Sequence, residues 1–256
     1  MTDELWFTRL LNQLLARPLD AVLGWLGLLS PHAPLMRALH LQPANPAAPI
    51  PDSLAMAVLV ALLLVVIGTV LARRLSVDRP GALQHTVEVG WTALESHSEE
   101  VIGHGGGRFI NYLFSLAVFI LIGNLLGLVP SFGTPTAAIP VTLGLAITAF
   151  VYYHVFGLRK HGLFGYLKTF MGPVAWMAPI MAVVEVFSHL ARIMSLSVRL
   201  YANMYAGELI TTIFVALLPV AGVLFMGLHV FVALLQTYIF VVLAMVYLAG
   251  ALAEEH

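Results

Sequence analysis

Four charged residues interrupt the apolar stretch from residue 169 to residue 253: Glu185, Arg192, Arg199 and Glu208. A charge at the centre of a bilayer costs about 2.5–3.5 kcal/mol on insertion scales, so such residues are functional candidates by default. Glu185, Arg192 and Arg199 are spaced seven residues apart, and each step of seven drifts only about 20° around a helix. The three therefore share one stripe, which His189 and Asn203 extend.

Arg199 differs from the other charges in its neighbours. No acidic residue lies three or four positions away, where the sequence has Ser195, Leu196, Ala202 and Asn203. Arginine stays charged in proteins, so this guanidinium needs a carboxylate from elsewhere. Glu185, His189 and Arg192, by contrast, could form a purely structural ion-pair cluster. Glu208 is nine residues after Arg199, about 180° around the helix, and serves a different environment.

Three further polar residues lie in apolar segments: Asn124, His229 and Gln236. His229 and Gln236 are two turns apart on one face of the last helix. Gln236 could reach Arg199 or a water chain, or it could hydrogen-bond to a neighbouring helix. For His229 the alternative is a hydrogen-bonded core histidine. Asn124 is a weaker candidate of the same kind.

The composition places these residues in lipid. The chain has 256 residues, of which 60% are hydrophobic and 10% charged, and its mean hydropathy is +0.94. This excludes a disordered chain, a basic nucleic-acid binder and an ordinary cytosolic enzyme. There is no cysteine, so disulfides and thiolate metal sites are excluded. No Gly-x-x-x-x-Gly-Lys motif occurs, and we expect no catalytic residue, cofactor or metal site.

The pattern predicts an all-α polytopic membrane protein. Five membrane helices are expected at 53–74, 109–130, 139–158, 176–218 and 220–252, with a cytoplasmic surface helix at 81–103. Residues 1–52 form a separate segment, with an amphipathic interfacial helix over 3–17 that Pro18 ends, and a Pro-rich connector over 31–52. The last two membrane helices exceed about 50 Å at about 1.5 Å per residue, so we expect a strongly tilted hairpin.

Basic residues predict the orientation. Lys and Arg flank only the connections after the first and third membrane helices: Arg73, Arg74, Arg79, Arg108, Arg159, Lys160 and Lys168. Cytoplasmic loops carry this excess. Five spans then place the N-terminus outside and the C-terminus in the cytoplasm.

Residues 195–209, SLSVRLYANMYAGEL, resemble the signature of the a subunit of F-type ATP synthases. The ending, with LQTYIF at 235–240 and Glu254, Glu255 and His256, is similar to the bacterial form, and the resemblance covers about residues 53–256. It implies a proton-translocating stator subunit in a bacterial inner membrane. The implied partners are a ring of c subunits, b-type peripheral stalk subunits, the rest of the synthase, protons and the lipid bilayer, with no nucleic acid.

The resemblance also implies roles for single residues. Arg199 is the essential arginine facing the ring carboxylates, and Glu208 and His229 line an aqueous half-channel. Gln236 lies near Arg199. Asn203, Glu185 and Arg192 occupy polar family positions. The sequence departs from the bacterial pattern at Gly127 and Ala138, where relatives often carry polar or acidic residues, so the outer access path has fewer carboxylates.

Two other functions fit a membrane protein with buried charges. A secondary transporter usually shows internal repeats and discontinuous helices, and the sequence has no repeat. A non-transporting scaffold would only pair its buried charges. Protons are favoured over sodium because no compact cluster of oxygen ligands is present.

Overall fold

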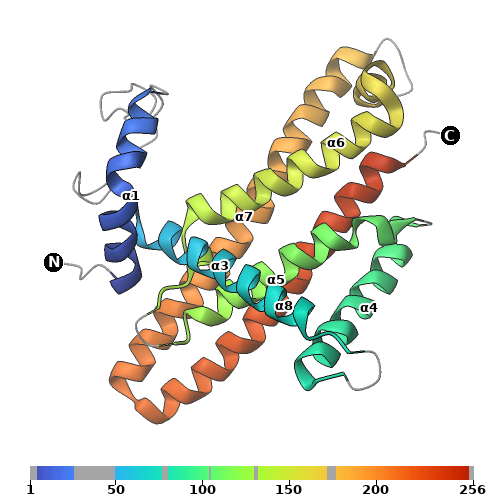
Figure 1. The fold of residues 1–256 in the computed structure, drawn as a ribbon. Coiled ribbons are helices and arrows are strands. Elements are labelled where there is room, and N and C mark those ends of the chain that lie inside the picture. Colours follow the sequence, from blue (N-terminus) through green and yellow to red (C-terminus); the bar gives the residue numbers. More distant parts are fainter. Residues whose placement is uncertain are drawn as a thin grey trace.

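The chain is a bundle of long helices in the computed structural model, which describes residues 5–25, 50–76, 80–103, 105–129, 132–171 and 177–253. These residues form helices joined by short connections, with no strand among them (Figure 1). Five of the helices are long and apolar enough to cross a membrane. The predicted all-α polytopic class is confirmed.

The five candidate spans are α3 (Asp52–Arg73), α5 (Ile110–Leu126) with the 3₁₀ turn η1 (Gly106–Phe109) before it, α6 (Ile139–Met171), α7 (Ala178–Leu217) and α8 (Pro219–Leu252). Their boundaries follow local chemistry. Asp52 in the first turn of α3 and Arg73 in its last turn complement the helix dipole. Both α7 and α8 have proline in the first turn, where a missing N–H costs nothing.

Two predicted helix ends were wrong by several residues. The helix expected to stop at residue 158 continues, as α6, to Met171 with a break at Gly162, whose φ is +69°. A positive φ is cheap only for glycine, so the break falls there rather than at the basic pair Arg159 and Lys160. The helix expected to reach residue 130 ends at Leu126, where Gly127 follows.

The N-terminal helix, α1 (Trp6–Trp25), also differs from the expectation. It runs through Pro18, which was expected to end it. Proline has a helical φ and removes one backbone N–H, so here the helix tolerates the loss. Residues 31–49 of the predicted Pro-rich connector lie outside the described residues, as do Glu254, Glu255 and His256.

The surface helix is α4 (Ala82–Ile102), which ends at Gly103 with φ +92°. It packs on the bundle through Trp91, whose ring centroid is 5.2 Å from that of Phe114 on α5. His97 on α4 also contacts α8, because its Nε2 lies 3.3 Å from the Tyr238 hydroxyl. α4 is therefore fixed to both α5 and α8.

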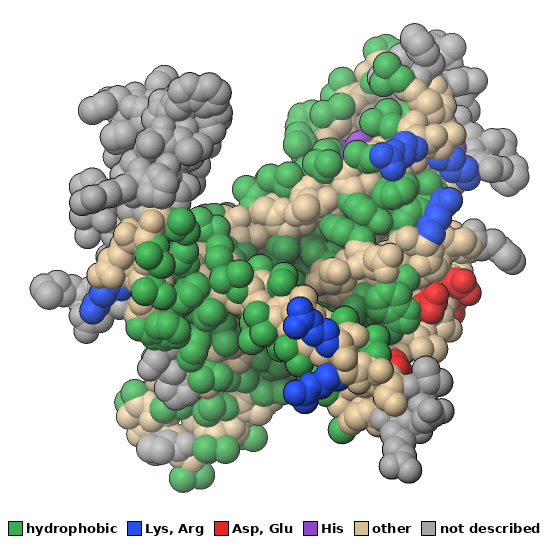
Figure 2. Space-filling model, in the orientation of Figure 1, with side chains coloured by type: hydrophobic (Ala, Val, Ile, Leu, Met, Phe, Trp, Pro, Cys, Tyr) green, Lys and Arg blue, Asp and Glu red, His purple; other side chains and the backbone are tan. Residues whose placement is uncertain are grey.

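The core lies between α5, α6, α7 and α8. Its fully buried side chains include Ile120, Leu200, Met204, Phe240 and Met245. Apolar side chains also cover much of the outer surface (Figure 2), as expected for a protein surrounded by lipid and membrane partners.

The last two helices form a long hairpin whose turn lies at the lower left of Figure 1. The 40 residues of α7 and the 34 of α8 correspond to about 60 and 51 Å of helix. α6 lies along α7, and the C-terminal ends of α6 and α8 lie at the opposite end of the molecule from the turn. Lys160 joins these two ends, because its Nζ donates to the Leu252 carbonyl at 2.7 Å.

Candidate functional site

Arg199 lies near the middle of α7 with its side chain exposed. Its Nη2 donates a long hydrogen bond of 3.4 Å to Ser195 Oγ, one turn earlier on the same helix. No carboxylate of the described residues forms an ion pair with it. The guanidinium therefore lies exposed on the surface of the hairpin without a neutralising carboxylate among the described residues.

Asn203 and Gln236 join the two helices of the hairpin beside Arg199. Asn203 Nδ2 donates to Gln236 Oε1 at 2.8 Å, and the Gln236 side chain is buried. The sequence left open whether Gln236 reaches Arg199. The Gln236 oxygen accepts a hydrogen bond from Asn203, which lies one turn after Arg199. Gln236 therefore positions a neighbour of Arg199, and the hydrogen-bond partner of Arg199 itself is Ser195.

Asn124 is a fully buried junction between α5, α8 and the 3₁₀ turn η2 (Pro135–Ala137). Its Nδ2 donates to the Ala233 carbonyl at 3.4 Å and lies 3.5 Å from Thr237 Oγ1. Its Oδ1 accepts a hydrogen bond from Thr136. Every polar atom of this carboxamide thus has a protein partner, which indicates an interhelical contact.

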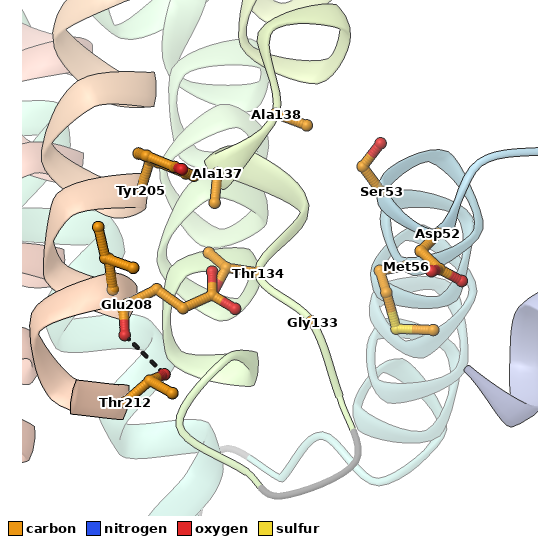
Figure 3. Close-up of a pocket in the computed structure, with 11 residues that line it drawn as sticks. Asp52, Ser53, Met56, Gly133, Thr134, Ala137, Ala138, Tyr205, Glu208 and Thr212 are labelled. Carbon is orange, nitrogen blue, oxygen red and sulfur yellow. Dashed lines mark hydrogen bonds between the residues drawn. The ribbon is translucent and has the colours of Figure 1, made fainter. Parts of the chain in front are cut away.

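Glu208 faces a cavity of about 390 Å³ between α3, α7 and the segment before η2 (Figure 3). The carboxyl group points toward Thr134, while Asp52 at the start of α3 contributes the other carboxylate across the cavity. The remaining polar lining residues are Ser53, Tyr205 and Thr212. Glu208 and Arg199 therefore serve different environments, as their spacing predicts.

His229 lies beside the Glu208 segment of α7. The residue is 4% exposed, and its Nε2 has no hydrogen-bond partner among the described residues. A Cβ placed on Gly207 would lie 2.7 Å from His229 Nδ1. The imidazole thus packs directly on the α7 backbone next to Glu208, with a buried nitrogen left for a water molecule or a proton.

Gly127 occupies the position after Asn124 where bacterial relatives often carry an acidic residue, and the close approach of Thr134 explains why this chain has glycine there. A Cβ on Gly127 would lie 1.7 Å from Thr134 Oγ1, so no side chain fits there while Thr134 keeps its position. Thr134 is buried and lines the cavity. The cavity therefore takes its carboxylates from α3 and α7, and Ala138 lines it without adding one.

The other end of α7 carries the predicted ion-pair cluster. Glu185 Oε1 lies 3.2 Å from His189 Nε2 and 3.8 Å from Arg192 Nη2. His189 Nδ1 lies 3.0 Å from the Tyr153 hydroxyl on α6, and Arg192 lies over the Tyr247 ring on α8 at 5.3 Å. The cluster joins three helices, as the structural interpretation requires. It also forms a continuous polar group at the end of the bundle opposite the hairpin turn.

No group of three metal-ligating side chains is found within the described part of the chain. The polar residues instead form three groups spread along α7. They are the Glu185 cluster, the Arg199–Asn203–Gln236 group, and the Glu208 cavity with His229.

Residues 54–249 match the family model described as "ATP synthase A chain". The chain is 48% identical over 257 residues, all of both chains, to a protein named ATP synthase subunit a from Koribacter versatilis. It is 47% identical to the protein of that name from Solibacter usitatus, over 83% of this chain and 92% of the relative. A relative from Syntrophotalea carbinolica is 43% identical over 77% of this chain and 84% of its own length.

The chain belongs to the ATP synthase A chain family. All nine polar residues singled out from the sequence lie inside the part that matches the family model, from Asn124 to Gln236.

Sequence reasoning missed some residues of the site. Asp52 looked like a simple end of the first span, and Thr134 and Tyr205 carried no signal, yet all three line the Glu208 cavity. Tyr153 was also missed as the partner of His189. The one available signal for Asp52 was its position as a polar residue at the end of a span. Tyr153, Tyr205 and Thr134 belong to no periodic pattern that could have revealed them.

Proposed function

We propose that the chain is the proton-translocating stator subunit of a rotary ATP synthase. Two aqueous half-channels carry protons to and from carboxylates on a ring of c subunits, and Arg199 separates the channels. Family membership supports this function over an ion-coupled secondary transporter. Nucleotide chemistry belongs to partner subunits, so this chain is a channel subunit and not itself an enzyme.

The observation that carries the proposal is an exposed arginine within a span, Arg199, which forms no ion pair with a carboxylate in the described part of the chain. A ring carboxylate crosses lipid far more easily when it is protonated. Close to Arg199 the ionised form is favoured. The carboxylate therefore releases its proton beside Arg199 and collects another after passing it. As a fixed positive charge, Arg199 also blocks direct proton flow between the half-channels.

The Glu208 cavity supports an outer half-channel. Asp52 and Glu208 supply carboxylates on either side of it, and the unpartnered His229 nitrogen lies beside Glu208. The Glu185 cluster, at the other end of α7, lines the cytoplasmic half-channel. Asn203 and Gln236 hold the hairpin together between the two channels.

The multi-pass protein lies in a bacterial inner membrane with its N-terminus outside and its C-terminus in the cytoplasm. The basic residues support this orientation. Arg73 and Arg74 lie at the C-terminal end of α3. Arg159 and Lys160 lie just before the break in α6, where Lys160 contacts the C-terminal end of α8. Arg79 and the Lys168 side chain fall outside what the structure describes. The partners are the c ring, b-type stalk subunits and the rest of the synthase, and the transported ion is the proton.

The test is ATP-driven proton pumping in inverted membrane vesicles. Arg199→Ala abolishes pumping while the protein remains inserted. Arg73→Ala, an exposed arginine at the end of α3, is the matched control and keeps pumping. Normal pumping in Arg199→Ala would refute the proposal. If the chain were a scaffold, Arg199→Ala would prevent assembly of the complex. If it were a secondary transporter, the chain would take up solute independently of the ATP synthase. Stimulation of ATP synthesis by sodium at fixed pH would exclude the proton as the ion.

A further inference from the structure

The N-terminal helix α1 packs on residues that line the Glu208 cavity, and it lies outside the region matched by the family model. We infer that α1 holds the mouth of this cavity in shape, and that Asn12 is the positioning residue that fixes Asp52 there. The inference rests on the proposed function, because it assigns Asp52 to proton uptake from the outside. Three sets of contacts and the exposed face of α1 carry it.

Asn12 clamps the chain just before α3. The side chain is 7% exposed. Its Nδ2 donates to the Ile50 carbonyl at 3.3 Å, and its Oδ1 accepts from the Ile50 N–H at 3.0 Å. The carboxamide thus satisfies both backbone groups of one residue, as a neighbouring strand would. Ile50 is two residues before Asp52, with the rigid Pro51 between them, so this clamp determines where Asp52 lies.

The start of α1 contacts Asp52 itself. The Leu5 N–H donates to Asp52 Oδ1 at 3.3 Å. The Leu5 side chain also reaches the opposite wall, since a Cβ on Gly133 would lie 3.4 Å from Leu5 Cδ1. Asp52 and Gly133 both line the cavity.

Apolar packing completes the contact. Phe7 and Leu11 are buried against Ile50, Ala55 and Met56, and Met56 lines the cavity. The Trp6 ring meets Phe132, next to Gly133, edge-on at 6.1 Å.

The free face of α1 explains what holds the helix in turn. Trp6, Leu10 and Leu14 are exposed on it. An apolar face that includes Trp suits the membrane interface. One face of α1 then lies on the bilayer, and the other packs on α3 and Phe132. The helix is held between the lipid surface and the cavity, which keeps the cavity residues in place.

The first experiment separates proton uptake from assembly. The rate of ATP synthesis is measured in vesicles that contain the complete synthase. The variable is the proton concentration on the side of the membrane that faces out of the cell. Asn12→Leu raises the half-saturating proton concentration severalfold while the maximal rate per assembled complex is retained. Gln13→Leu, an exposed amide on the same helix, leaves both unchanged and is the matched control. A fall in maximal rate alone, or equal curves for the two variants, would overturn the inference.

The second experiment does not depend on proton transport. The chain has no cysteine, so Ser53→Cys provides a single thiol in the cavity, next to Asp52. A membrane-impermeant maleimide added from outside labels it severalfold faster with Asn12→Leu than with Gln13→Leu, because the start of α3 has lost its clamp. Equal labelling rates refute the role of Asn12. Failure of the Arg199 test would leave this labelling result unaffected, so the two hypotheses fail separately.

Leu5→Pro is a milder variant for the case in which Asn12→Leu does not assemble. It removes the N–H that binds Asp52 before α1 begins at Trp6 and leaves the helix hydrogen bonds in place. Leu5→Ala keeps the N–H and is its control. Leu5→Pro raises the half-saturating proton concentration above that of Leu5→Ala, and the same value in both would contradict the inference.

Discussion

Asn203 on α7 and Gln236 on α8 are joined by a hydrogen bond of 2.8 Å, one turn from Arg199. The Gln236 side chain is buried, while Asn203 is exposed on the face that carries Arg199. The contact connects the arginine's surface to the interior of the hairpin. It therefore fixes the two helices against each other at the level where Arg199 meets its partner.

The Asn203–Gln236 contact predicts measurable coupling between the two residues. Hydrogen bonds between membrane helices contribute about 0.6 kcal/mol on average in double-mutant cycles. We expect Asn203→Ala and Gln236→Ala to show about this coupling in the unfolding free energy of the purified complex. Both single variants should also pump less, because the helix pair beside Arg199 loosens.

Thr148→Ala provides the control for that cycle. Thr148 is exposed and bonds to Gly144 of its own helix, so combined with Asn203→Ala it should give additive effects. Additive effects in the Asn203–Gln236 pair as well would show that the hydrogen bond contributes nothing.

Gly207 is predicted to be essential because His229 packs on it. A Cβ there would lie 2.7 Å from His229 Nδ1, so Gly207→Ala must displace the imidazole or shift α7. Overpacking of this kind costs about 1–3 kcal/mol. We expect lower thermal stability and strongly reduced pumping, measured on the purified complex and in inverted vesicles.

Gly227→Ala is the matched control for Gly207→Ala. Gly227 also lies in a helix, but a Cβ there would meet nothing within 4 Å. Alanine is a better helix former than glycine by about 1 kcal/mol, so this variant should be as stable as the parent or more stable, with normal pumping. Equal effects of the two substitutions would argue against the His229 packing.

The carboxylates of the cavity are predicted to differ in importance. Glu208 points into the cavity from α7, beside His229, whereas Asp52 lies across the cavity at the start of α3. Glu208→Gln removes the group that passes protons onward and should abolish pumping. Asp52→Asn should only reduce it, because water can still reach the cavity.

Glu88→Gln, an exposed acid on the surface helix α4, is the control for these two variants and should pump normally. The measurement is pumping per assembled complex. A larger loss from Asp52→Asn than from Glu208→Gln would contradict the order in which the two carboxylates handle the proton.

The sequence alone determined the class of protein, the number of candidate spans and the candidate polar residues on α7. Hydropathy is a local property, and a fixed helical period turns the spacing of Glu185, Arg192 and Arg199 into a shared stripe. The same reasoning separated Glu208 from Arg199. It was wrong at Pro18 and at the end of α6, because whether a helix continues past a proline or a glycine depends on packing as well as on the residue.

Only the tertiary structure decided which polar groups meet. Asn12 meets Ile50 across 38 residues, Gln236 meets Asn203 across 33, and Asn124 meets Thr237 across 113. Hydropathy and helical period place a residue on a face of its own helix and say nothing of the helix opposite. That choice follows from how the helices pack, which is why the pairing of Asp52 with Glu208 around one cavity became visible only in the folded chain.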